Sequence, residues 1–175
     1  MEELEELKRR LEEDRPMPWD AFPDIGLYMD QVISYIARQL ITYDEGESLT
    51  PAMVNNYIKD GLLPRAEGKK YNKTHLGYLT AICALKQVLS VRETRDLLQV
   101  GTRGRDPEAL YAAFCRELSL AQDCAAEVLD PTLPEEELPG LALRLALRSY
   151  ADKLACQRVL SLLAPRDEKA ERKKK

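Results

Sequence analysis

Helix start and stop signals follow one another closely over residues 50–72, and this stretch restricts the fold more than any other part of the sequence. Thr50 can cap the N-terminus of a helix, and the proline after it suits the first helical turn, where a missing N–H costs nothing. Gly61 can adopt the left-handed conformation that commonly ends a helix. Pro64 and Gly68 then interrupt the chain. The pattern predicts a short helix that ends at Gly61 and is followed by a non-helical segment.

The segment 62–71 cannot be helical, because Pro64 and Gly68 interrupt it. We expect it to form a short two-stranded β wing. Asn72 is a suitable cap for a helix over about 73–89. The S-x-x-E spacing at 90–93 is a capping box, which predicts a further short helix up to Leu98. The order of helix, wing, helix and helix is that of a winged helix-turn-helix.

Helical patterns continue on both sides of this unit, and the predicted class is all-α with a small β wing. Further helices are expected at about 2–14, 24–40, 106–129 and 138–163. Trp19 and Phe22 lie between prolines and are expected to anchor their segment to the body. The expected parts are a charged N-terminal helix and linker (1–18), a winged helix-turn-helix DNA-binding region (19–100), a helical dimerisation or regulatory extension (106–164) and a charged tail (165–175).

Charge is distributed unevenly along the chain, whose formal net charge is -4. Residues 1–49 contain 5 basic and 13 acidic groups, and residues 106–175 contain 11 and 13. Residues 50–105 contain 10 basic and 4 acidic groups, so the middle of an acidic protein is basic. A local basic patch is typical of a surface that binds a polyanion, although charges can also cluster by chance.

The predicted helix 51–60 has two faces when it is placed on a helical wheel. Its core-facing stripe consists of Val54, Tyr57, Ile58 and Gly61. Its other face consists of Ala52, Asn55, Asn56 and Lys59. Asparagine can make paired hydrogen bonds to an adenine edge, and lysine can contact guanine or phosphate. We therefore expect this second face to read the major groove of double-stranded DNA.

Basic residues follow this helix, and we expect them to contact the phosphates on either side of the groove. The hydroxyl of Tyr71 could do the same, or its ring could simply order the wing, and both can hold. The candidate DNA-binding residues are Thr50, Ala52, Asn55, Asn56, Lys59, Arg65, Lys69, Lys70, Tyr71 and Lys73, with His75 nearby.

The run LTPAMVNNYIKDGLLPRAEGKKYNKTHLGYLTAICALKQVLSVRETRDLL resembles the winged helix-turn-helix of the MerR family. The matching positions are Tyr57, Gly61, Leu62, Leu63, Pro64, Tyr71, Leu76, Leu79, Leu89, Ser90 and Leu97. The resemblance implies DNA binding through the helix and the wing. Asn55 and Asn56 stand where that family usually has Arg and Tyr, so its phosphate contacts do not carry over at these two positions.

Two stretches, PDIGLYMDQVISYI and TPAMVNNYIKDGLLP, are similar to the signature stretches of an uncharacterised bacterial family. That family is described as a domain of unknown function with a MerR-like unit. The resemblance covers about Trp19 to Leu98.

Two apolar helices are predicted in the C-terminal third, and two interpretations of them stay open. They can complete the core of one domain, or they can form the interface of a homodimer, as the antiparallel dimerisation helix of MerR proteins implies. DNA readers commonly pair across a two-fold axis, which favours the dimer on functional grounds.

Several other functions are not expected from this sequence. The charged N-terminus is not a signal peptide, and charges interrupt the apolar stretch 138–163, so we expect a cytoplasmic protein without a membrane span. The four cysteines lack metal-ligand spacing and are expected to be buried, reduced thiols. With one histidine and no phosphate-binding loop, neither an enzyme nor a cofactor is expected. The favoured function is a sequence-specific transcriptional regulator, and the alternative is a protein-interaction or adaptor domain that reuses the winged fold.

Overall fold

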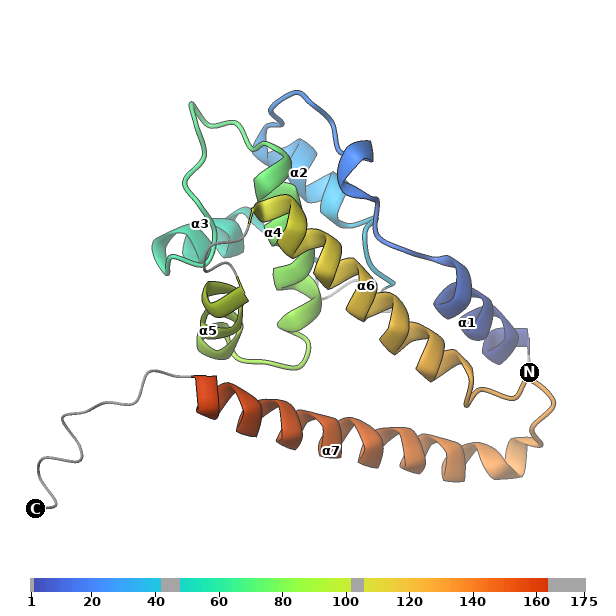
Figure 1. The fold of residues 1–175 in the computed structure, drawn as a ribbon. Coiled ribbons are helices and arrows are strands. Elements are labelled where there is room, and N and C mark those ends of the chain that lie inside the picture. Colours follow the sequence, from blue (N-terminus) through green and yellow to red (C-terminus); the bar gives the residue numbers. More distant parts are fainter. Residues whose placement is uncertain (1, 42–47, 102–105, 164–175) are drawn as a thin grey trace, which may run out of the picture.

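The computed structural model describes residues 2–41, 48–101 and 106–163, and these ranges are mostly helical (Figure 1). The elements are α1 (Glu2–Glu13), the 3-10 turn η1 (Trp19–Ala21), α2 (Met29–Ile36), α3 (Pro51–Lys59), α4 (Lys73–Leu85), α5 (Val91–Gly101), α6 (Pro107–Ala126), the 3-10 turn η3 (Glu135–Glu137) and α7 (Leu138–Leu163). The prediction of an all-α class is confirmed. The predicted tail 165–175 lies outside the described residues.

The predicted β wing is present only as two isolated antiparallel bridges, with no strand in the described parts of the chain. One bridge joins Glu67 to Lys70 across a tight turn, and the other joins Leu27 to Tyr71. The second bridge pairs the end of the 62–71 segment with the chain before α2 instead of with itself. A two-stranded wing would need a longer run of such pairs.

Helix α2 is shorter than the predicted helix 24–40 at both ends, and a tertiary contact accounts for its late start. The backbone N–H and C=O of Leu27 both bond to Tyr71, each with an N···O distance of 2.9 Å. Leu27 is therefore extended, and the helix begins at Met29 and ends at Ile36.

Helix α4 lies at the centre of the molecule and supplies much of its core. The side chains of Leu76, Leu79 and Ile82 are fully buried. On a neighbouring face, a Cβ added at Gly77 would lie 3.1 Å from the Trp19 ring and 3.2 Å from the ring of Tyr111 on α6. This close approach lets α4 pack directly under an aromatic cluster.

Trp19 and Phe22 anchor the N-terminal segment, as predicted. The centroid of the Phe22 ring lies 5.0 Å from that of Tyr111, and the Trp19 ring lies 6.0 Å from the same residue. The Tyr111 hydroxyl also donates a 2.8 Å hydrogen bond to the carbonyl of Met17. These contacts hold the proline-rich segment against α6.

Helix α1 packs along the C-terminal half of α6, on the opposite side of the molecule from α3 (Figure 1). The ammonium of Lys8 donates to the carbonyls of Ala126 and Leu129, at 3.0 and 3.2 Å, where α6 ends. A cation at a helix C-terminus is favourable because it satisfies free carbonyls and the helix dipole. Arg15 adds an ion pair with Asp123. The acidic helix α1 therefore does not cover α3.

The four cysteines are free thiols. Burial raises the pKa of Cys83 to about 11, and it raises the pKa of Cys115 as well, so both stay protonated at neutral pH. Cys83, Cys115 and Cys156 are only partly buried, so the prediction of buried cysteines holds in part for them, and it is wrong for Cys124, which is exposed. It lies on a face of α6 that neither α1 nor the core covers.

Helix α7 runs back along the molecule in the opposite direction to α6 (Figure 1). Leu141 is the only residue of this long helix classed as buried. Near its other end, the Gln157 amide donates a 2.9 Å hydrogen bond to Glu93 of α5. None of the described helices has the length and apolar character needed to cross a membrane.

Candidate nucleic-acid interface

Helix α3 begins at the predicted cap. The Thr50 hydroxyl accepts a 3.2 Å hydrogen bond from the N–H of Met53, and Pro51 occupies the first helical position. This cap satisfies one of the otherwise free N–H groups of the first turn. The hydroxyl of Thr50 is thus engaged by its own helix.

The two faces of α3 agree with the helical wheel. Val54 and Tyr57 are buried, and Ile58 packs against the same core. The opposite face, which is solvent-exposed throughout, consists of Ala52, Asn55, Asn56 and Lys59. We call these four residues the α3 face. It contains no acidic residue.

A tight turn ends α3 and directs the chain outwards. Gly61 has a φ of 69°, in the left-handed region that favours glycine. The N–H groups of Leu62 and Leu63 then donate to the carbonyl of Tyr57, at 2.8 and 3.1 Å. Both leucine side chains are buried, so they anchor the turn. Arg65 follows this turn and is exposed.

The tip of the next segment presents two lysines to solvent. The N–H and C=O groups of Glu67 and Lys70 bond to each other at 3.0 and 3.2 Å, and both Gly68 and Lys69 have positive φ. The ammonium of Lys70 lies 5.6 Å from the centre of the Tyr28 ring, a cation–π contact. We call Arg65, Lys69 and Lys70 the basic loop.

The only histidine of the chain holds the two ends of the basic loop together. Nδ1 of His75 lies 3.1 Å from the backbone nitrogen of Asn72 and 2.7 Å from the side-chain oxygen of the same residue, and Nε2 lies 3.3 Å from the carbonyl oxygen of Arg65. Burial lowers the pKa of His75 below the 6.5 of an ordinary histidine, which favours the neutral ring.

Two predicted site residues do not lie on the exposed surface. Tyr71 is only 5% exposed, and its ring packs edge-on against His75 with centroids 5.3 Å apart. Burial raises the pKa of Tyr71, and the side chain orders the base of the loop. Lys73 is half-buried, and its ammonium pairs with Asp24 at 2.6 Å.

One further exposed residue, Tyr28, contacts the basic loop through Lys70 and was not predicted as part of the site. The sequence pattern assigned Tyr28 to a helix, in which its relation to Lys70 could not be seen. The bridge between Leu27 and Tyr71 is what brings this segment to the loop.

The family model described as "Domain of unknown function (DUF1836)" matches residues 17–114, which is more than half of the chain. The match begins at the anchored segment, contains the α3 face and the basic loop, and ends within α6. No curated protein and no solved structure matches the chain.

Proposed function

The chain belongs to the DUF1836 family, and we propose that it is a sequence-specific DNA-binding transcriptional regulator with a MerR-like winged helix-turn-helix. The observation that carries this proposal is the exposed, acid-free α3 face, which a basic loop follows directly in the chain. Neither α1 nor α7 covers α3 (Figure 1).

The α3 face has the side chains that base reading requires. Asn55 and Asn56 each offer an amide donor and an acceptor, the pair that matches an adenine edge in the major groove. Ala52 is small enough to let the helix approach the bases. Lys59, at the last position of α3, can reach guanine or a phosphate.

The basic loop supplies the phosphate contacts in this proposal. Arg65, Lys69 and Lys70 are all exposed, and the His75 contacts limit the freedom of the segment that carries them. Fixed cations lose less entropy on binding than freely moving ones. Such contacts position a protein on the duplex and contribute most of its salt-dependent affinity.

We further propose that α7 makes the protein a homodimer. Four apolar residues on one side of α7 are between 49% and 62% exposed, and they are Leu143, Leu147, Tyr150 and Leu154. Their spacing of four, three and four residues is that of a coiled-coil seam. The side of α7 that contains the buried Leu141 faces the body, so the seam on the other side is without a partner in the described chain.

An antiparallel pair of α7 helices fits this seam. A two-fold axis midway along it would place Leu147 against Tyr150 of the second copy, and Leu143 against Leu154. Ala146 and Ala151 flank the seam and allow close approach of the helices. A dimer would also present two α3 faces to the repeated half-sites of an operator.

The test is a selection of duplexes from fragmented bacterial DNA, followed by affinity measurement with fluorescently labelled duplexes over a range of salt concentrations. We expect recovered fragments to share a motif, and the affinity for that motif to fall steeply with salt. If no duplex binds at low salt, the DNA-binding proposal fails.

The alternative is a protein-interaction or adaptor domain, and the exposed seam of α7 is the observation that favours it. In that case a pull-down with the full chain would recover a stable protein partner but no nucleic acid. The pull-down separates the two functions, because a protein partner would bind the seam on α7 and DNA would bind the α3 face.

A further inference from the structure

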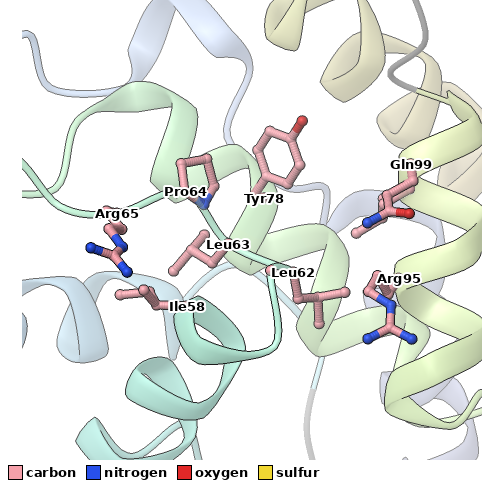
Figure 2. Close-up of a pocket in the computed structure, with 10 residues that line it drawn as sticks. Ile58, Leu62, Leu63, Pro64, Arg65, Tyr78, Arg95 and Gln99 are labelled. Atoms are coloured by element: carbon pink, nitrogen blue, oxygen red, sulfur yellow. The ribbon is translucent and has the colours of Figure 1, made fainter.

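A groove of about 390 Å³ lies beside the C-terminal end of α3 (Figure 2). Four segments line it. They are the last turn of α3 with Ile58, the turn 61–65, α4 with Tyr78, and α5 with Arg95, Leu98 and Gln99. A volume of this size is within the range of small-molecule sites in proteins.

The groove has an apolar floor between two cations. Leu62, Leu63 and Leu98 line it and are buried in the core, so their positions are fixed. Arg65 lies at one side of Leu62 and Leu63, and Arg95 lies at the other (Figure 2). None of the described residues that line the groove is acidic.

Both arginines keep hydrogen-bonding capacity for a ligand. Arg95 makes two long contacts, in which Nη1 lies 3.5 Å from the carbonyl oxygen of Asp60 and Nε lies 3.8 Å from a carboxylate oxygen of Asp96. A guanidinium has five N–H donors, so most of those on Arg95 are not used by these contacts. Within the described residues, no carboxylate forms an ion pair with Arg65.

We propose that this groove binds a small organic anion, a carboxylate with an apolar body. The body would pack on the exposed parts of Ile58, Pro64 and Tyr78, and the carboxylate would pair with Arg65 or Arg95, the latter being partly desolvated by its neighbours. A ligand with a carboxylate at each end could engage both arginines. A DNA phosphate fits less well, because a phosphodiester has no apolar part to place on these side chains.

The position of the groove links such a ligand to the basic loop. The turn 61–65 connects α3 to the loop, and a bound anion would tie Arg65 towards α5 and away from a phosphate. This consequence rests on the proposed function and would make the anion an inhibitory effector. The binding of the anion itself does not depend on the proposed function.

The test measures anion binding to the full chain without DNA. The probes are 2-naphthoate, 4-phenylbutyrate and octanedioate, with neutral 2-naphthamide as the uncharged match of the first. Binding is followed by amide chemical shifts in NMR spectra. At least one carboxylate should shift the amides of Leu62, Leu63 and Gln99 in a saturable way, and 2-naphthamide should bind more weakly than 2-naphthoate.

Variants at the two arginines decide whether the charges act as proposed. Arg65→Gln and Arg95→Gln should each weaken the binding of a carboxylate that contacts them, by about tenfold, the loss expected for one charge-assisted hydrogen bond. Arg92→Gln is the matched control, because Arg92 lies on the same helix α5 but does not line the groove. Arg65 is exposed, so its variant remains informative if Arg95→Gln unfolds the chain.

The proposal is overturned if none of the three carboxylates shifts these amides at concentrations up to about 10 mM. That concentration is near the largest Kd expected for such ligands. It is also overturned if both arginine variants bind every probe as tightly as Arg92→Gln does. A separate titration of duplex DNA tests the inhibitory consequence. Failure of DNA binding alone would remove the regulator but leave the anion site intact.

Discussion

The ammonium of Lys86 lies over the ring of Tyr57, 5.2 Å from its centroid, and donates a 3.1 Å hydrogen bond to the hydroxyl of the same residue. Tyr57 belongs to the buried stripe of α3, and Lys86 is the C-cap residue directly after α4. This contact connects the helix with the candidate reading face to the central helix of the core.

The hydrogen bond to Tyr57 can be removed without a change in packing. Tyr57→Phe keeps the ring and leaves the Lys86 ammonium half-exposed, so we expect the free energy of unfolding to fall by about 1 kcal/mol. Urea unfolding at equal protein concentrations measures it. Tyr28→Phe is the control on an exposed tyrosine outside the α7 seam, and it should change stability by less than about 0.5 kcal/mol because the ring that contacts Lys70 is kept. Equal effects of the two variants would contradict a stabilising role of the contact.

Gly61→Ala should destabilise the fold by about 1 kcal/mol, because an L residue at a φ of 69° is strained. Space does not oppose the change, since no atom lies within 4 Å of the added Cβ. Gly140→Ala is a matched control, because its Cβ is also unobstructed but the residue lies in α7. There alanine should stabilise by up to about 1 kcal/mol. Thermal unfolding of both variants should therefore give shifts of opposite sign.

The pKa of His75 predicts a pH dependence of stability. Burial favours the neutral ring, so the folded-state pKa lies below 6.5 and the unfolded chain binds the proton more readily. Stability from this group is complete above about pH 6.5 and is lost as the pH falls from there through the folded-state pKa. We expect the free energy of unfolding to decrease between pH 7.5 and 5.5, and the decrease to be smaller in His75→Gln.

An NMR titration of the imidazole checks this directly, since the chain has one histidine. A folded-state pKa above 6.5 would reverse the sign and show that the ring is held in its charged form.

The α3 face and the basic loop should respond differently to substitution if the protein reads DNA. Asn55→Ala or Asn56→Ala should change the preferred base at one position, with a loss of about 1–3 kcal/mol for the original site. Lys69→Gln or Lys70→Gln should weaken binding to all duplexes alike and reduce its salt dependence.

The control for the lysine variants is Arg116→Gln on α6, which removes the same charge at an exposed position away from α3. Fluorescence anisotropy with the selected duplex and a scrambled one compares all variants. Equal losses from Arg116→Gln and Lys69→Gln would mean that only net charge matters.

The seam of α7 predicts that a charge within it prevents dimerisation. Leu147→Glu or Leu154→Glu should give a monomer in sedimentation equilibrium, because burial of an unpaired carboxylate is costly. Val159→Glu is the control on the same helix, since Val159 is 54% exposed but lies about 140° around the helix from Leu154. It should leave the dimer intact. A monomeric parent protein at high concentration would refute the proposed dimer.

The sequence by itself determined the features that depend on a few neighbouring residues. The cap at Thr50, the left-handed Gly61 and the exposure of Asn55 and Asn56 were all predicted correctly, as was the capping box at 90–93. Each of these follows from local hydrogen bonding, backbone sterics or the helical repeat, which act within one or two turns.

Only the tertiary structure decided the features that join distant segments. Leu27 pairs with Tyr71, which shortens α2, buries Tyr71 and brings Tyr28 to the ring contact with Lys70. In the same way, Arg65 and Arg95 line one groove although α4 separates them in the chain. Such contacts form because backbone groups and apolar surfaces need partners anywhere in the chain, and local sequence patterns carry no record of which partner is reached.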